Sequence, residues 1–396
     1  MARRFTVDFL KTEAASGLVL AAAALAAILL ANSPWREAYF GFVKSPFTLQ
    51  VGSWEETKSV LKWTKDGLMA VFFFVVGLEI KYEILRGELS SPRKLATPVF
   101  AALGGMLVPA LIFVAFNLGD GGELRGWPIP TATDIAFALA ALAIAAPRLP
   151  ASLRVFLLTL AIADDLGAVL LIAVLFSSQI DLAALAGAGV GLALLAWFGR
   201  WKGDPTLLFA LVFLGVWALT LMSGVNTSLA GVAAALTVPV AGHRHGEEGQ
   251  LKQYMEALHP YVAYAVLPFF AFVAAGFAFD AFPEGGLLAP LPLGIAAGLV
   301  LGKPLGVLGA TALVVSLKLG RRPSGSTWLQ ILGVSMLCGV GFTMSLFIGG
   351  LAFHDGAAAS QVQLGVIAGS VLSVLAGAIT LRLAQPPAPK TANADF

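Results

Sequence analysis

The stretch VFLLTLAIADDLGAVLLIAVLFSSQI, residues 155–180, decides how this sequence is interpreted. It is long enough to cross a bilayer as a helix, which needs about 20 mainly apolar residues. Two adjacent acids, Asp164 and Asp165, stand near its middle. A charged side chain at the centre of a membrane helix costs about 2.5–3.5 kcal/mol on insertion scales, so such residues are rare and usually functional. The stretch therefore predicts a transmembrane helix that carries an acidic site.

Neighbouring residues on a helix point about 100° apart. One of the two carboxylates can therefore face a water-filled cavity while the other faces an adjacent helix. This arrangement suits a cation site beside a charge partner. The alternative is a pair of buried carboxyls that are satisfied by hydrogen bonds and serve packing alone.

The composition excludes a soluble globular protein. Of the 396 residues, 58% are hydrophobic and only 12% are charged, which is typical of a membrane protein with many spans. The net charge of +2 is too small to indicate a nucleic-acid partner. A single cysteine, Cys338, excludes an intrachain disulfide framework, and the four histidines form neither an H-E-x-x-H pair nor a zinc-type cluster. We therefore expect no enzyme and no resident cofactor.

The apolar content is spread along the chain, which predicts one transmembrane domain over residues 1–384. The fold class is an all-α polytopic membrane protein with twelve spans, at about residues 14–31, 60–85, 96–117, 126–146, 155–180, 182–198, 207–222, 227–241, 260–279, 287–317, 328–350 and 362–383. Residues 242–258 are predicted to be a charged loop. Residues 385–396, rich in proline and alanine, are predicted to be a disordered tail.

Between the first two spans, residues 41–57 contain turn residues and alternating side chains that indicate a small external β-hairpin. An ordered external loop of this kind predicts a contact between subunits, and hence a homodimer. Most of the 25 Lys and Arg residues fall at span ends on the side of the N-terminus. The positive-inside rule then predicts that both termini are cytoplasmic.

The span 126–146 is predicted to be broken. Pro128 and Pro130 stand shortly before Asp134, and a proline inside a helix removes a backbone donor and clashes with the preceding turn. Thr131 and Thr133 supply side-chain oxygens beside this break.

The span 328–350 is predicted to be broken as well, where Gly339 and Gly341 flank Val340. Each broken span is the middle one of three, and the two groups of three start on opposite sides of the membrane. This pattern predicts an inverted repeat, with units at about 95–180 and 287–384, and a site where the broken helices cross.

Broken helices expose helix ends inside the membrane, with partly positive N-terminal ends and partly negative C-terminal ends. An acid can neutralise the first and a base the second. Asp134 and Lys303 are each the lone charge in their span, which makes them the candidates. The alternatives are helix capping alone for Asp134 and a purely structural ion pair for Lys303.

The acidic pair can do two mutually exclusive things. Ionised, Asp164 and Asp165 offer oxygen ligands to a small hard cation. Desolvated and close together, the two carboxyls favour holding protons, and their titration is coupled. A site that holds either protons or a cation, and that is exposed to each side in turn, is that of an antiporter.

Several motifs resemble the NhaA family of bacterial sodium/proton antiporters, itself a known example of inverted repeats with broken helices. The resemblance covers about residues 9–384, and the motifs occur in the order of the family. They are LMAVFFFVVGLEIKYE (68–83), PTATDIAFALA (130–140), LAIADDLGAV (160–169), LHPYVAY (258–264), GKPLG (302–306) and GVGFTMSLFIGGLAF (339–353).

The resemblance implies a protein of the bacterial inner membrane that exchanges internal Na⁺ or Li⁺ for external protons electrogenically. It implies that Asp165 is the main cation carboxylate, that Asp164 is its partner in proton binding, and that Lys303 pairs with Asp164 and carries protons. Asp134 and Lys303 would balance the helix ends, with Thr133 beside the crossing.

The resemblance also implies that residues 41–57 form the dimer contact. Glu79 and Glu83 match the cytoplasmic funnel through which relatives attract cations and respond to pH, and Glu256 lies in a segment that is partly alike. Two positions depart from the best-known relatives: Asn226 stands where they have a histidine, and Tyr82 stands where they have an arginine. These departures bear on the pH dependence rather than on transport itself.

Two other classes of membrane protein compete with this interpretation. An intramembrane aspartyl protease also buries two aspartates, but it needs a G-x-G-D motif, and the sequences before Asp120 and Asp204 do not have it. A sodium-coupled symporter on a similar fold would need a pocket for an organic substrate. The paired aspartates with a buried lysine favour proton exchange over both.

Overall fold

The computed structural model of the chain describes residues 2–52, 54–87, 92–177, 180–199, 206–240, 249–281, 285–353 and 356–385. This part of the chain is mostly helical, with one small antiparallel sheet. The predicted all-α polytopic fold class is confirmed. Of the predicted disordered tail, all but Gln385 lies outside the described residues.

The elements follow in this order, where α is an α-helix, β a strand, and η a π-helical turn (η1, η5, η8) or a 3-10 turn (the others): α1 (Ala2–Ala31), α2 (Arg36–Lys44), β1 (Pro46–Val51), β2 (Trp54–Ser59), α3 (Val60–Trp63), η1 (Thr64–Leu68), α4 (Met69–Leu85), α5 (Pro92–Asn117), η3 (Leu124–Gly126), η4 (Ile129–Thr131), α6 (Ile135–Ala145), α7 (Ala151–Leu175), α8 (Leu182–Phe198), α9 (Thr206–Met222), α10 (Ser228–Thr237), α11 (Gln250–Tyr261), η5 (Val262–Val266), α12 (Leu267–Ala274), η6 (Phe279–Ala281), η7 (Gly286–Leu288), α13 (Pro290–Ala297), η8 (Gly298–Gly302), α14 (Lys303–Ser316), α15 (Trp328–Leu337), α16 (Phe342–Ala352) and α17 (Ala357–Leu383).

Six stretches are long and apolar enough to cross a membrane, namely Ala14–Ala31, Ala96–Asn117, Ala151–Leu175, Gln250–Ala274, Pro290–Ser316 and Ala357–Leu383. Two further spans are helix pairs, each bent by 44° at a break. The shorter apolar helices α8, α9 and α10 and the continuous run α3–η1–α4 complete the described set. They follow the order of the twelve predicted spans.

The two bent pairs are η3–η4 with α6, and α15 with α16. The first is interrupted where Ala132 and Asp134 take extended backbone angles, directly after the prolines. The second is interrupted at residues 338–341, around the two glycines. Both predicted breaks are confirmed, and each bent pair is the middle of three spans, as in the predicted inverted repeat.

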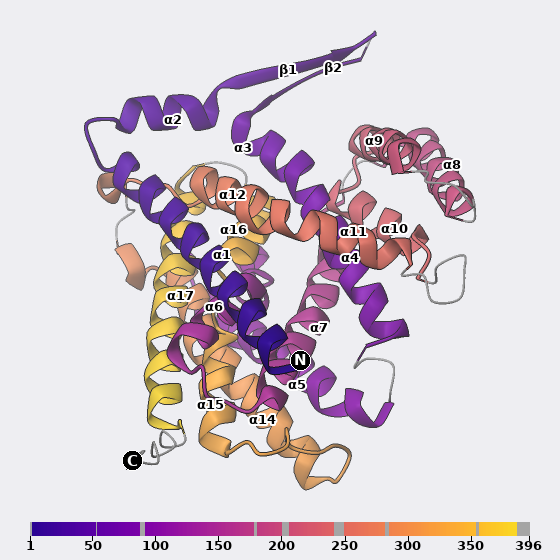
Figure 1. The fold of residues 1–396 in the computed structure, drawn as a ribbon. Helices are drawn as coiled ribbons and strands as arrows, with labels where there is room; N and C mark the ends of the chain where they lie inside the picture. The colour runs from indigo at the N-terminus through magenta and orange to yellow at the C-terminus, as the bar shows by residue number, and fades with distance from the viewer. Residues whose placement is uncertain are drawn as a thin grey trace, which may run out of the picture.

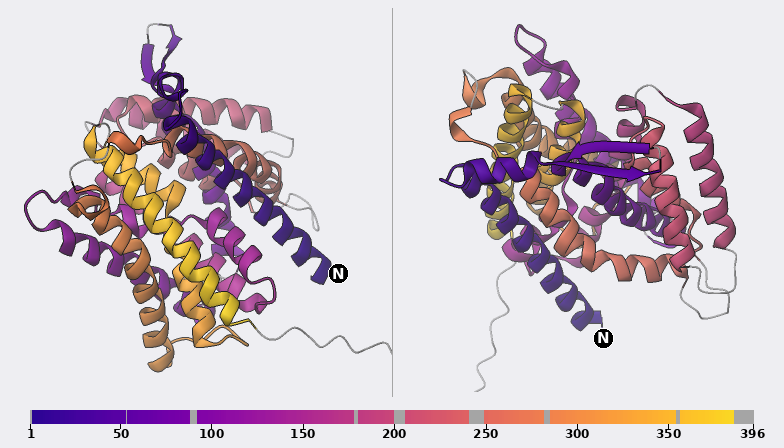
Figure 2. Two further views of the ribbon diagram at one scale, coloured as in Figure 1. Left: turned by 90° about the vertical axis from the view of Figure 1, so that its left-hand side faces the viewer. Right: turned by 90° about the horizontal axis from the view of Figure 1, so that it is seen from above.

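Around the bent pairs the helices form one body, with α14 packed against α5, and α17 packed against α13 and α15 (Figure 1). Helices α8 and α9 lie together at the opposite edge from α17. The start of α1 and the end of α17 both lie on the side away from the β1–β2 hairpin, which projects from the molecule (Figure 2).

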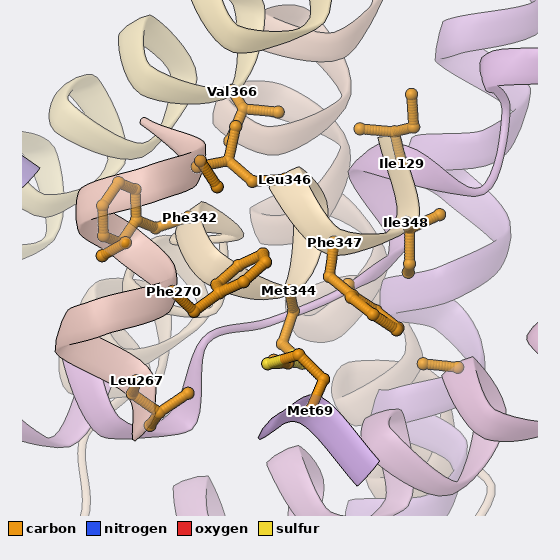
Figure 3. Close-up of a cluster of buried hydrophobic side chains, with 14 of the residues drawn as sticks. Met69, Ile129, Leu267, Phe270, Phe342, Met344, Leu346, Phe347, Ile348 and Val366 are labelled. Carbon is orange, nitrogen blue, oxygen red and sulfur yellow. The ribbon is translucent and has the colours of Figure 1, made fainter. Parts of the chain in front are cut away.

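The largest group of buried apolar side chains lies between α4, α12, α16 and α17 (Figure 3). Phe347 is its centre, with ring centroids 5.3 Å from Phe73 and 6.2 Å from Phe270. The name central cluster is used below for Met69, Phe73, Ile129, Leu267, Phe270, Phe342, Met344, Leu346, Phe347, Ile348, Val362 and Val366.

The hairpin differs in its bounds from the predicted segment 41–57. The strands pair in antiparallel register from Pro46 opposite Ser59 to Val51 opposite Trp54. The first part of the predicted segment instead ends α2. The reason is helical periodicity, since Tyr39 and Val43 are four residues apart and are both buried on one face of α2.

The predicted loop 242–258 is wrong in its second half, where α11 begins at Gln250; residues 241–248 lie outside the described part. Leu251, Tyr254, Met255 and Leu258 recur at the spacing of one helix face and join the apolar group around α4 and α10. Their spacing is that of an amphipathic helix, although the charged residues between them give the segment the composition of a loop.

Candidate ion-binding site

The unwound segments of the two bent pairs meet at a backbone hydrogen bond, which the Asp134 N–H donates to the Val340 carbonyl at 2.6 Å. Four helix ends therefore converge at this crossing: the end of η4, the start of α6, the end of α15 and the start of α16. Each presents N–H or C=O groups that lack partners within their own helix.

Asp134 caps two of these ends. One carboxylate oxygen accepts from the Phe137 N–H at 3.0 Å, at the start of α6. The other accepts from the Thr343 N–H at 3.0 Å, and also from the Thr343 hydroxyl, at the start of α16. An acid beside two helix N-termini is stabilised by both dipoles. The capping that the sequence predicts for Asp134 is thus double.

Lys303 lies at the opposite kind of helix end. Its ammonium group donates to the Thr131 carbonyl, the last residue of η4, at 2.6 Å, and to Asp164 Oδ2 at 2.5 Å. The side chains of Lys303 and Asp164 are both fully buried. The positive charge thus complements a partly negative helix end and one of the two predicted acids at once.

Thr133 connects this ion pair to the second bent pair. Its hydroxyl oxygen lies 2.7 Å from Asp164 Oδ2 and 2.9 Å from the Cys338 carbonyl, at the end of α15. A hydroxyl has one proton to donate, so it serves one of these acceptors at a time. The Thr133 hydroxyl therefore links the Lys303–Asp164 ion pair to the end of α15.

Asp165 faces in a different direction from Asp164. It lines a cavity of about 480 Å³, whose lining does not include Asp164. Asp165 Oδ2 is buried and has no hydrogen-bond partner in the described part of the chain. The divergence expected for neighbouring residues of one helix is present: one acid is held by a lysine, and the other is open to the cavity.

The same cavity brings together residues that are far apart in the sequence. Asp134 and Thr343 line it near the crossing, and Glu79, Glu83 and Glu256 line it elsewhere. Glu256 is exposed while Asp165 is only 2% exposed, so the cavity leads from the surface to Asp165. Tyr82 and His259 also contribute to its wall.

Asn226 lies apart from this cavity wall. Its side-chain oxygen accepts from the N–H and the hydroxyl of Ser228, at 3.0 and 2.7 Å, at the start of α10. In this chain the residue therefore acts as a local helix-start partner. Tyr82, the second departure from the best-known relatives, does line the cavity.

The glycines and the proline of the breaks allow close packing at the crossing. A Cβ atom on Gly339 would lie 2.4 Å from the Leu299 carbonyl oxygen, so a larger side chain there would push the break away from this backbone. A Cβ atom on Gly341 would lie 2.1 Å from Ser345 Oγ and would displace that hydroxyl. Pro130 packs against Gly298, where a Cβ would be 2.7 Å from the proline ring. Leu299 and Gly298 both belong to η8.

Two features of the site were not predicted. Thr343, the second residue of α16, binds Asp134. It is a hydroxyl residue beside a helix break, as Thr131 and Thr133 are, so the same sequence feature could have identified it. The π-helical turn η8 directly precedes Lys303. Such turns are often found at functional sites, but the sequence GLVLG carries no distinct signal for one.

Many apolar spans, two bent helix pairs and buried charges where the pairs cross define a secondary transporter with inverted repeats, which is a multi-pass integral membrane protein. The sequence model of the family "Na+/H+ antiporter 1" matches residues 7–381. The chain belongs to this family.

Curated relatives support this over nearly their whole length. The chain is 46% identical over 380 residues to the Na(+)/H(+) antiporter NhaA of Aeromonas hydrophila, covering 96% of each chain. It is 46% identical over 390 residues to that of Rhodospirillum rubrum, covering 96% of this chain and 97% of the relative. It is 43% identical over 387 residues to the Na(+)/H(+) antiporter NhaA 2 of Erythrobacter litoralis, covering 98% and 96%.

Proposed function

We propose that this protein is an electrogenic antiporter that exports Na⁺ or Li⁺ in exchange for external protons by alternating access. The observation that supports it best is the divergent acidic pair. Asp165 presents an unpartnered carboxylate oxygen at the inner end of a cavity, while Asp164 next to it is bound by a buried lysine. Family membership supports the same reaction.

In the proposed mechanism, protons and the cation compete for the same carboxylates. A small hard cation prefers oxygen ligands, which Asp165 offers in its ionised form, with Asp164, Thr133 and Asp134 nearby. Protonation removes these ligand charges and releases the cation. Lys303 takes part in the charge balance of the site and carries a proton. It loses its negative partner when Asp164 takes up a proton, and it regains that partner when Asp164 releases the proton. The Na⁺ is a transported substrate and not a resident cofactor.

We propose that Glu79, Glu83 and Glu256 attract cations into the cavity and contribute to regulation by pH. Carboxylates in a low-dielectric cleft raise the local cation concentration and speed its entry. All three line the cavity that leads to Asp165. Of the two positions that differ from the best-known relatives, Tyr82 lines the cavity and Asn226 does not. The difference at Tyr82 therefore bears more directly on the pH response.

The proposed setting is the bacterial inner membrane, with lipid around one transmembrane domain at residues 1–384 and repeat units at about 95–180 and 287–384. Both termini are proposed to be cytoplasmic. The excess of Lys and Arg at span ends on the N-terminal side supports this orientation. The start of α1 and the end of α17 lie on the same side of the molecule, as an even number of spans requires.

Proton movement in sealed proteoliposomes tests the proposed reaction. With a preset pH gradient, acid inside, addition of Na⁺ or Li⁺ is expected to dissipate the gradient, and addition of K⁺ is not. A membrane-permeant anion should change the rate if net charge moves with each cycle. Absence of proton movement at every pH from about 6 to 9 would refute the antiporter and favour a symport assay next.

We propose that the hairpin, Pro46–Ser59, forms the homodimer contact. A two-stranded sheet is marginal by itself, and each strand leaves one edge unpaired, so a partner strand would stabilise it. Phe47 on β1 is 57% exposed. Replacing residues 46–59 by a short Gly-Ser linker is expected to convert the purified dimer to a monomer by light scattering coupled to size exclusion. A linker variant that stays dimeric would place the contact elsewhere.

A further inference from the structure

Residues of the central cluster, which Figure 3 shows, line two different cavities. Leu267 and Met344 of this cluster line the cavity that reaches Asp165, which is called the main cavity below. Leu346 and Val362 of the same cluster line a second, small cavity of about 50 Å³. Side chains two positions apart on α16 therefore face two different cavities, with the apolar cluster between them.

Lys65 lies in the wall of the small cavity and contacts the end of α16. Its ammonium group donates to the Gly350 carbonyl at 3.5 Å, in the last turn of that helix. Helix α16 thus has the acid Asp134 at its N-terminal end, in the ion site, and a base near its C-terminal end. Both charges are favourable for the helix dipole.

Gly350 is what allows this approach. A Cβ atom at this position would come within 2.0 Å of the Lys65 ammonium nitrogen, so any larger residue would displace the lysine. The contact therefore depends on two residues, and each can be altered separately.

The turn that carries Lys65 is itself held in place from other directions. Lys65 belongs to η1, a π-helical turn. The next residue, Asp66, forms an ion pair with Lys58 of β2 at 2.7 Å, and its carbonyl accepts from the Trp217 indole of α9 at 2.6 Å. These two contacts hold η1 against the hairpin and α9, and the Lys65 contact holds the end of α16 against η1.

We propose that Lys65 is a positioning residue for transport, which holds α16 against η1 and so keeps the hairpin side of the cation path closed. Opening of that side requires the end of α16 and η1 to separate, and the small cavity is where the separation begins. The inference deepens the proposed function and rests on its alternating-access step. Loss of the Lys65 contact shifts the population toward the form that is open on the hairpin side.

Cysteine accessibility tests this directly. Cys338, the single native cysteine, is replaced by alanine, and one reporter is introduced at a time: Leu346→Cys for the small cavity or Ile162→Cys for the main cavity. A membrane-impermeant thiol reagent is added to right-side-out vesicles for the first reporter and to everted vesicles for the second. Each reporter protein is used only if it still exchanges Na⁺ for protons.

Lys65→Met keeps the length of the side chain and removes its charge. It is expected to speed labelling at position 346 by roughly two- to tenfold and to slow labelling at position 162, because one population grows at the expense of the other. Gly350→Ala should act in the same direction by displacing the lysine. Lys62→Met is the matched control, since Lys62 is an exposed lysine of α3 one turn earlier, and it should change neither rate.

The inference is overturned if Lys65→Met labels position 346 no faster than Lys62→Met does. A faster rate at 346 without a slower rate at 162 also overturns it, because Lys65 would then merely cover its own small cavity. If Lys65→Met does not reach the membrane, Gly350→Ala decides by the same two criteria. Failure of the proposed function has a different signature, namely no cation-driven proton movement in the unmodified protein.

Discussion

Asp165→Asn is expected to abolish the proton movement that Na⁺ or Li⁺ drives in proteoliposomes, a loss of at least about 100-fold, the lower range for removal of a proton-transferring group. The amide has the shape of the carboxyl group but can neither hold the exchanged proton nor balance a cation. Because Asp165 Oδ2 has no protein partner among the described residues, the substitution removes little that holds the fold together.

Asp120→Asn is the matched control for this experiment. It removes the same charge from an exposed acid in the segment between α5 and η3, which does not line the cavity that reaches Asp165. Its exchange rate should equal that of the unmodified protein. Full-rate exchange by Asp165→Asn would contradict the assignment of the cation carboxylate and would direct attention to Asp164, without refuting the exchange reaction itself.

The parts of the site that could be predicted are those set by local geometry and by the energetic cost of burying charge. Adjacent residues of a helix must diverge, so one of Asp164 and Asp165 could be expected to face a cavity. A lone acid after two prolines could be expected to cap a helix end. Lys303 could be singled out as the one charged residue inside its span, whereas its pairing with Asp164 was implied by the resemblance to the family.

What could not be predicted depends on which atoms meet across the fold. Asp134 binds the start of α16 as well as of α6, a contact between residues 209 positions apart. The same holds for Thr133 and the Cys338 carbonyl. The three π-helical turns have no sequence signal, because each differs from the surrounding helix by one shifted backbone hydrogen bond. Of these, η1 and η8 carry or adjoin the lysines that contact the bent pairs.

Lys303→Met is expected to destabilise the protein strongly, by about 3–5 kcal/mol, because it leaves Asp164 buried without its counter-charge. It also leaves the Thr131 carbonyl without its donor, at the end of η4. The midpoint of thermal unfolding of the detergent-solubilised protein, followed by tryptophan fluorescence, should fall accordingly. Asp164→Asn alone should destabilise for the complementary reason, since it leaves the ammonium group buried without a carboxylate.

The double variant Asp164→Asn, Lys303→Met distinguishes the contribution of the charges to stability from the contribution of side-chain packing. Both side chains keep nearly their original volumes and neither is charged, so most of the lost stability should return. Recovery in the double variant shows that the single variants fail through an uncompensated charge and not through packing. If Lys303→Met alone leaves the unfolding midpoint unchanged, Asp164 carries no charge against Lys303 in this conformation, and the proton carried by the pair must then reside on the carboxyl group.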